Sequence, residues 1–109
     1  MDSRVPLLAE QLLLIERELR LQNWWSEQPP AAEALASQQP FCVDTLAFEQ
    51  WLQWIFLPRM KQLLESAAAL PTASGIQPMA EQVYQGEMGR ARELIRLLGE
   101  FDRLIAGAT

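Results

Sequence analysis

Residues 48–60 read FEQWLQWIFLPRM, and this stretch decides the expected fold. It holds two of the four tryptophans and two of the four phenylalanines in the chain. The broad apolar face of this region is made of Phe48, Trp51, Leu52, Ile55, Phe56 and Leu63. Further apolar residues lie on the other sides of the same helical pattern, which is typical of a helix inside a bundle. We therefore expect this stretch to form the central helix of a small all-helical domain.

Pro58 lies inside this helical pattern. Proline lacks the backbone N–H, and its ring clashes with the carbonyl four residues earlier, which here belongs to Trp54. Residues 59–69 are again good helix formers and continue the periodicity. The pattern therefore predicts a kink between Trp54 and Pro58 rather than the end of the helix. Capping groups for its start are expected at Asp44 and Thr45.

The first helix is expected to begin after Ser3, a suitable capping residue, with Pro6 in its opening turn. One apolar stripe at helical spacing consists of Val5, Leu8, Leu12, Ile15 and Leu19. A second stripe contains Leu7, Leu14 and Leu21. Two adjacent stripes indicate burial on two sides. Either this helix lies between two neighbours in the bundle, or Leu7, Leu14 and Leu21 contact another copy in a homodimer.

A long connection follows over residues 23–44, where the prolines at positions 29 and 30 interrupt any helix. A loop of this length inside a small domain needs anchors or a function. Trp24, Trp25 and Phe41 are the large apolar residues available as anchors. We expect an ordered loop that covers one end of the bundle.

The second half of the chain predicts two more helices. Pro78 and Gly86 bound a short helix over residues 79–84, and an amphipathic last helix runs to about residue 106. No segment shows the alternating pattern of a strand. The sequence therefore predicts an all-α bundle of about four helices, formed by one domain over residues 1–109.

Composition excludes several classes of function. The formal net charge is -5, from nine basic and fourteen acidic residues. Tight nucleic-acid binding needs a net positive surface, so direct binding is not expected. The chain has no histidine, which excludes serine-histidine catalysis and histidine-ligated metal sites. The remaining acids are scattered, so we expect a protein that is not an enzyme.

The single cysteine, Cys42, cannot form an intrachain disulfide and is expected to be a small buried apolar residue. The N-terminus lacks a signal-peptide pattern, and no apolar run approaches the ~20 residues that span a bilayer. We expect a cytoplasmic protein without membrane contact. No metal-spaced cluster or phosphate-binding glycine loop is found, so no metal and no cofactor are expected.

The tryptophans are the first candidates for a binding surface. Trp51 and Trp54 could stack on a base or cofactor ring, but core packing is the more ordinary role of such residues. Trp54 projects off the main apolar face and is the better candidate of the two. Because Trp24 and Trp25 are adjacent, one of them is expected to point away from the packing of the other. That exposed ring would suit a partner surface; alternatively it folds under the loop.

Arg59 is the second kind of candidate. On a straight helix it falls near Leu52 and Ile55, inside the apolar face. A buried guanidinium needs a carboxylate or several carbonyls as partners. One interpretation is a structural bond, for example to Asp44 or to the carbonyl that Pro58 leaves free. The other is a site for an anionic ligand.

The chain contains the short motifs PF at 40–41, VDTL at 43–46, WLQWI at 51–55, PRM at 58–60 and LP at 70–71. Together these motifs resemble the YqcC-like family of small bacterial proteins. Trp24 after a leucine-rich first helix and the amphipathic last helix also fit, so the resemblance covers nearly the whole chain. It departs from the family near residues 31–37 and 85–89. The resemblance implies an all-α bundle and carries no established biochemical activity.

Members of that family are often encoded beside a tRNA pseudouridine synthase. Such synthases are larger α/β enzymes with a catalytic aspartate, and that architecture does not fit in this chain. The leading hypothesis is therefore a non-enzymatic adaptor that docks on another protein near Trp24 and Trp25. The alternative is a ligand-binding bundle with an apolar pocket walled by Trp51, Trp54 and Phe56, in which Arg59 contacts an anion.

Overall fold

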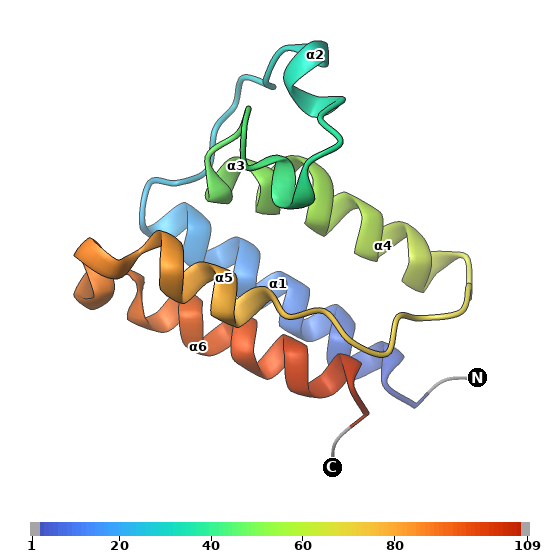
Figure 1. The fold of residues 1–109 in the computed structure, drawn as a ribbon. Coiled ribbons are helices and arrows are strands. Elements are labelled where there is room, and N and C mark those ends of the chain that lie inside the picture. Colours follow the sequence, from blue (N-terminus) through green and yellow to red (C-terminus); the bar gives the residue numbers. More distant parts are fainter. Residues whose placement is uncertain (1–2, 108–109) are drawn as a thin grey trace.

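Helices pack around one apolar core in the computed structural model, which describes residues 3–107 (Figure 1). The helices are α1 Val5–Leu21, α2 Ala32–Leu35, α3 Phe48–Trp51, α4 Leu57–Glu65, α5 Ile76–Val83 and α6 Met88–Ile105. A π turn, Leu52–Phe56, joins α3 to α4, and 3₁₀ turns occupy Pro40–Cys42 and Gln85–Glu87. Residues 3–107 contain no strand. The predicted all-α class is confirmed.

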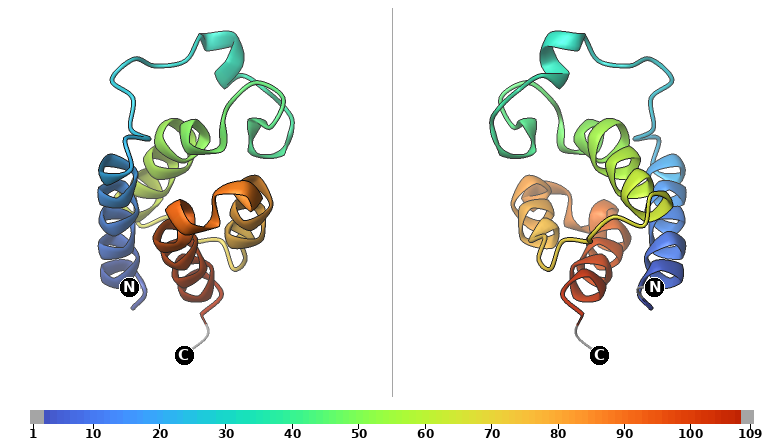
Figure 2. Two further views of the ribbon diagram at one scale, coloured as in Figure 1. Left: turned by 90° about the vertical axis from the view of Figure 1, so that its left-hand side faces the viewer. Right: turned by 90° about the vertical axis from the view of Figure 1, so that its right-hand side faces the viewer.

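The core lies where α1, α4 and α6 meet. α1 packs against both α6 and α4, and α5 packs against α6 (Figure 2). The largest fully buried side chains are Leu8, Leu12, Ile15, Leu19, Leu52, Leu57, Leu94, Leu98, Phe101 and Ile105. Four of the five residues in the first predicted stripe of α1 are therefore in the core. Within residues 3–107 no helix has the length and apolar character needed to cross a membrane.

The second stripe of α1 is largely outside the core. Leu7 and Leu21 are exposed, and Leu14 is half-buried. The helix begins at Val5 with Arg4 at the N-cap position and no side-chain capping bond, so the expected cap from Ser3 is wrong. Arg4 is instead held by a bond from its guanidinium to the carbonyl of Ile105 at the end of α6 (2.5 Å).

The predicted irregularity before Pro58 is a π turn, and the helix continues beyond it. The N–H of Leu57 donates to the carbonyl of Leu52, five residues back rather than four. A proline cannot donate to the preceding turn, and a wider turn relieves the clash of its ring. The helix therefore continues to Glu65, but its faces change phase at the π turn.

Because of this change of phase, the expectation that Arg59 lies inside the apolar face is wrong. The π turn adds a residue, so the buried positions run Leu52, Phe56 and Met60, each four apart. On a regular helix Arg59 would share that face, but here its side chain is exposed. Neither the buried structural bond nor an anion site inside the apolar face exists at Arg59.

The connection after α1 rises over α3 and carries the short helix α2 (Figure 1). Trp24, Trp25 and Phe41 are half-buried and pack against the core. The expected capping by Asp44 and Thr45 is wrong, because both side chains brace this loop. Asp44 accepts a bond from the Ser37 hydroxyl (2.6 Å), and the Thr45 hydroxyl donates to the carbonyl of Ala34 (2.8 Å).

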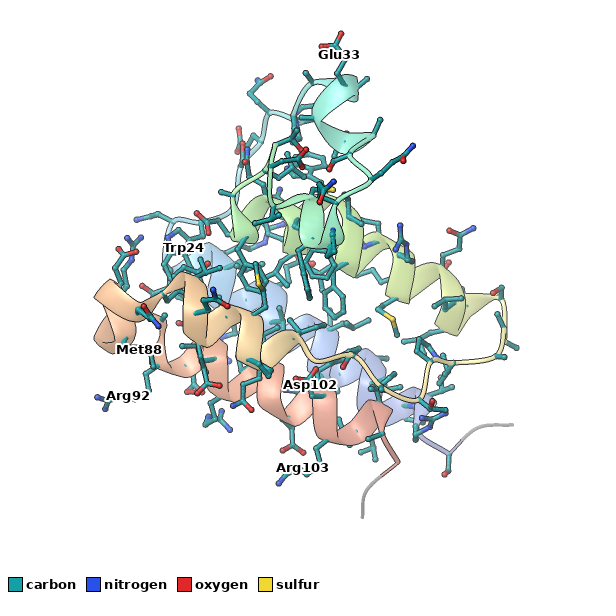
Figure 3. All side chains as sticks on the ribbon, in the orientation of Figure 1. Trp24, Glu33, Met88, Arg92, Asp102 and Arg103 are labelled. Atoms are coloured by element: carbon teal, nitrogen blue, oxygen red, sulfur yellow. The ribbon has the colours of Figure 1, made fainter. Side chains whose placement is uncertain are left out.

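The start of α5 is organised by a residue of α6. Asp102 points toward it (Figure 3), and its carboxylate accepts the backbone N–H groups of Ile76 (3.0 Å) and Gln77 (2.8 Å). A carboxylate there satisfies donors that a helix N-terminus leaves free. The helix therefore begins at Ile76, after Gly75 in the left-handed conformation (φ 66), which is two residues before Pro78.

Candidate functional site

A hollow of about 660 Å³ lies between α1, the first residues of the loop and the π turn. We call it the α1–π cleft. The residues that line it are Glu16, Arg20, Trp25, Ser26, Glu27, Gln53, Trp54, Leu57, Pro58 and Lys61. It combines two tryptophans with four ionisable side chains. A hollow with aromatic walls and a few polar groups is the usual form of a binding site.

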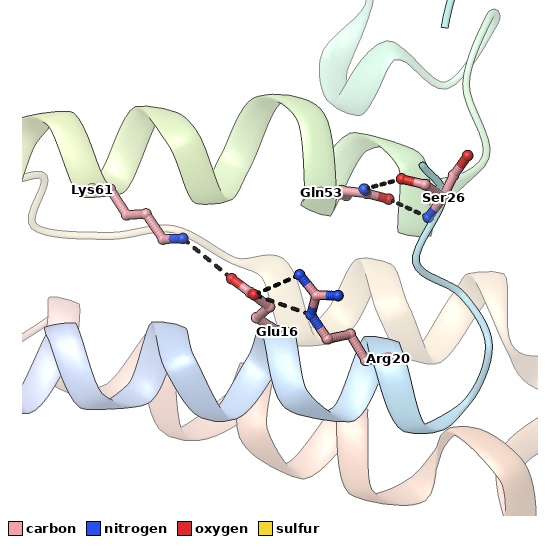
Figure 4. Close-up of polar contacts among 5 residues, drawn as sticks. All are labelled: Glu16, Arg20, Ser26, Gln53 and Lys61. Carbon is pink, nitrogen blue, oxygen red and sulfur yellow. Dashed lines mark hydrogen bonds and ion pairs between the residues drawn. The ribbon is translucent and has the colours of Figure 1, made fainter. Parts of the chain in front are cut away.

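Glu16 links the two sides of the α1–π cleft (Figure 4). One carboxylate oxygen accepts a bond from Arg20 Nε on the same helix (3.1 Å), and the other contacts Lys61 Nζ on α4 (3.2 Å). Partial burial raises the pKa of Glu16, but the hydrogen bonds and charges of Lys61 and Arg20 outweigh it and hold the pKa below its ordinary value. Glu16 is therefore ionised at neutral pH and suits a structural role better than proton transfer.

Gln53 fastens the loop to the π turn. Its side-chain oxygen accepts the N–H of Ser26 (2.9 Å), and its side-chain nitrogen donates to the carbonyl of Ser26 (2.5 Å; Figure 4). Gln53 is buried, so this reciprocal pair satisfies polar groups that water does not reach. The pair fixes the position of the neighbouring Trp25.

The two tryptophans of the α1–π cleft offer different surfaces. The guanidinium of Arg20 lies over the ring of Trp25, 4.4 Å from its centre, so one face of that ring is already covered. Trp54 Nε1 is buried and has no hydrogen-bond partner among residues 3–107. A buried donor without an acceptor costs about 1–3 kcal/mol. This donor comes from a π turn, a feature that recurs at functional sites.

The α1–π cleft supplies binding groups. Arg20 and Lys61 are hydrogen-bond donors that border an apolar surface, and this surface includes Trp54, whose own N–H is buried in the free chain. Such a set fits a flat or apolar group that carries a hydrogen-bond acceptor. The described residues contain no group of three or more acids or cysteines that could hold a metal ion.

The structure places two of the predicted site residues, Trp25 and Trp54, in the α1–π cleft. Trp24 lies elsewhere. Its ring stacks on the ring of Tyr84, with 4.9 Å between the ring centres. The guanidinium of Arg90 lies over the same Trp24 ring, 4.5 Å from the ring centre. Burial raises the pKa of Tyr84. The hydrogen bond that its hydroxyl donates to Glu49 (2.7 Å) raises this pKa further, by a smaller amount. Trp24 therefore belongs to a structural stack.

Trp51 lies on the other side of the interrupted helix. With Phe56 and Phe101 it lines a separate apolar hollow of about 240 Å³. The expected pocket walled jointly by Trp51, Trp54 and Phe56 is therefore wrong, and the exposed Arg59 lines neither hollow.

Sequence reasoning missed four polar side chains of the α1–π cleft, namely Glu16, Arg20, Gln53 and Lys61. A spacing of four residues between Glu16 and Arg20 by itself indicates only support of the helix. The helical pattern around Gln53 and Lys61 shows no partner for either residue. Their partners lie 27 and 45 residues away along the chain, so no local pattern could reveal them.

Comparisons with known proteins match nearly the whole chain. The family model DUF446, described as tRNA pseudouridine synthase C, matches residues 7–104. An uncharacterised protein of Haemophilus influenzae is 42% identical over 104 residues, which are 95% of this chain and 94% of that protein. Protein YqcC of Escherichia coli is 32% identical over 96 residues, 88% of each chain. The solution NMR structure of that YqcC superimposes on this chain with a TM-score of 0.86 at 29% sequence identity. The match covers 99% of this chain and 92% of the YqcC chain.

One further relative is much longer. A protein named tRNA pseudouridine synthase C, from Pectobacterium carotovorum, is 41% identical over 90 residues. Those residues are 83% of this chain but 24% of the relative. Most of the Pectobacterium protein therefore has no counterpart here.

Proposed function

The chain belongs to the YqcC-like family, DUF446. From this premise we propose that it is a non-catalytic interaction module that binds a tRNA pseudouridine synthase. The Pectobacterium relative supports this proposal. In that protein a segment similar to this chain and a much longer part without similarity to it belong to one polypeptide. A covalent link holds two modules together at millimolar effective concentration. A module that is a separate chain needs a binding surface to achieve the same association.

The α1–π cleft is the surface that suits this role best. Tryptophan and arginine are the residues most enriched among the strong contacts of protein interfaces, and Trp25, Trp54 and Arg20 meet there. The proposed partner segment inserts an apolar side chain beside the two tryptophans. It also presents an oxygen atom to the unpaired Trp54 Nε1–H, which is buried in the free chain and becomes accessible when the indole side chain rotates.

The composition supports a non-catalytic role. The chain has no histidine, and its net charge is -5. In the α1–π cleft the carboxylate of Glu16 is engaged by two cations. Both the chemistry and the RNA contact are accordingly assigned to the partner enzyme.

The test is isothermal titration of this protein with the tRNA pseudouridine synthase C encoded in the same genome. Trp54→Phe removes the donor and keeps an aromatic ring, and we expect it to weaken binding about tenfold, which corresponds to ~1.4 kcal/mol. Trp51→Phe makes the same replacement on the opposite side of the helix and is the matched control. Absence of binding at about 100 µM of each protein, well above a micromolar Kd, would reject the proposal.

A second candidate function is favoured by the same unpaired donor. A small planar ligand with an acceptor atom would satisfy Trp54 Nε1–H as well as a protein segment would. Benzoate and uridine monophosphate are suitable probes, because each joins a flat ring to an anionic group. Tight binding of either probe, together with no binding of the synthase, would favour this second function.

A further inference from the structure

Among residues 3–107 no element covers the outer face of α1, and only its edge borders α6, where Arg17 and Leu21 line the same hollow as Glu93. Leu7, Leu13 and Leu21 are 53%, 62% and 65% exposed. The other large exposed apolar residues of the described chain, Val43, Val83 and Met88, are on other elements. Figure 2 shows α1 at the edge of the molecule, with its packed side turned toward α4 and α6.

Two opposite charges lie on this same face. Glu10 and Arg17 are seven residues apart, about two helical turns, so they share one side of α1. Both are exposed, and neither makes an ion pair or hydrogen bond within residues 3–107. On α6, Glu93 pairs with Arg96 at a spacing of three, whereas Arg92 is exposed and unpaired within residues 3–107, as Glu10 and Arg17 are. The face of α1 therefore carries one unused charge of each sign among exposed leucines.

We propose that this face binds a second copy of the chain, with the two α1 helices antiparallel about a two-fold axis near Leu13 and Leu14. The midpoint of Glu10 and Arg17 falls between those two leucines. Antiparallel packing about that midpoint sets Glu10 opposite Arg17 of the second copy, and symmetry repeats the pair. Each charge then lies about 5 Å along the helix from the axis, within reach of its counterpart.

The leucines follow the same symmetry. Leu7 and Leu21 lie on opposite sides of the axis at nearly equal distances, so Leu7 of one copy meets Leu21 of the other with an offset of about 1.5 Å along the helix. A parallel arrangement would instead set Glu10 against Glu10 and Arg17 against Arg17, which is unfavourable. The charges thus favour antiparallel over parallel packing of two copies.

The size of the seam limits its strength. One 17-residue helix is about 26 Å long, and a pair of such helices buries less than the ~1,600 Å² of a standard interface. We therefore expect a concentration-dependent dimer with a Kd on the order of 10 µM. Leu7, Glu10 and Arg17 do not line the α1–π cleft, so the dimer leaves that cleft open.

Sedimentation equilibrium of the full chain between about 1 and 500 µM, a range that brackets this Kd, tests the dimer. Glu10→Arg and Arg17→Glu each set like charges opposite one another twice, and each should raise the Kd at least tenfold. The double variant with both changes restores opposite charges and should recover the wild-type Kd. Arg92→Glu, an equally exposed charge reversal on α6, is the control and should leave the Kd unchanged.

Two results would overturn the proposal. A wild-type chain that stays monomeric at every concentration would exclude the seam. A dimer that withstands either single reversal, or that the double variant fails to restore, would exclude the pairing of Glu10 with Arg17. Circular dichroism of each variant verifies that the fold is intact, because both sites are exposed and their reversal should not unfold the chain.

Discussion

Trp51 and Trp54 lie three residues apart on the same interrupted helix, but their surroundings differ. The ring of Trp51 contacts those of Phe41 (4.8 Å between centres) and Phe56 (5.5 Å). Trp54 faces the α1–π cleft, with polar and charged neighbours and an unpaired N–H. A large aromatic residue is therefore no evidence of a site by itself. The polar groups around it and the state of its own donor distinguish a binding surface from a core.

The largest expected effect on stability comes from Phe101 of α6, which packs against the Trp51 side of the interrupted helix. Phe101 is fully buried, and its ring meets Phe56 edge to face (4.9 Å between centres). Phe101→Ala should lower the free energy of unfolding by about 3–5 kcal/mol, because it removes contacts and leaves a cavity. Urea denaturation measures the change. A loss below about 2 kcal/mol would mean that this side is not the tightly packed one.

The two tryptophans provide a direct test of the contrast. Trp51→Ala should cost about 3 kcal/mol, because it empties a position that other aromatic rings enclose. Trp54→Ala should cost at least ~1 kcal/mol less, since removal of the indole also removes an unpaired donor. Both values come from the same urea measurement. Equal losses would show that the two environments do not differ energetically.

The bond between Gln53 and the loop gives a smaller effect. Gln53→Ala leaves the N–H and the carbonyl of Ser26 without their partners and should destabilise the protein by about 1–2 kcal/mol. Gln62→Ala, at an exposed position on α4, is the matched control and should change stability by less than ~0.5 kcal/mol. Indistinguishable thermal unfolding of the two variants would contradict the role of Gln53.

The smallest expected effect on stability comes from the negative charge of Glu16. The pKa of Glu16 is lower in the folded chain than its ordinary value, so its stabilising contribution is present above that ordinary value. The contribution is lost as the pH falls through the folded pKa. Because Arg20 and Lys61 are 56% and 44% exposed, solvent screening limits it to less than ~1 kcal/mol.

Glu16→Gln should therefore be slightly less stable than the wild type at about pH 7, and the difference should be smaller at about pH 3. The comparison requires urea denaturation of both proteins at both pH values. A difference that grows toward low pH would have the wrong sign for a carboxylate with a lowered pKa.

Local patterns predicted most of the fold. The stripe through Leu8, Leu12, Ile15 and Leu19 repeats every three or four residues, so it identified the buried face of α1. Contacts between distant segments were not predictable. Asp102 starts α5 from α6, 26 residues further along the chain, and nothing near Ile76 in the sequence indicates this.

The candidate site was predicted only in part. Trp25 and Trp54 were among the candidates because large aromatic residues outside a main apolar face need explanation. Arg59 was misplaced because a regular helical period was applied across the π turn, which shifts every later face. The involvement of Lys61 depends on that same shift and on a partner in α1.

The most direct test of docking in the α1–π cleft is a two-dimensional ¹H–¹⁵N spectrum of the labelled protein during addition of tRNA pseudouridine synthase C. The four tryptophans each have an indole N–H signal, so each ring reports separately. We expect the signal of Trp54 to shift or broaden first, since an acceptor reaches its N–H, while that of Trp51 stays in place. Movement of Trp51 without Trp54, or no change in any indole signal, would contradict the account.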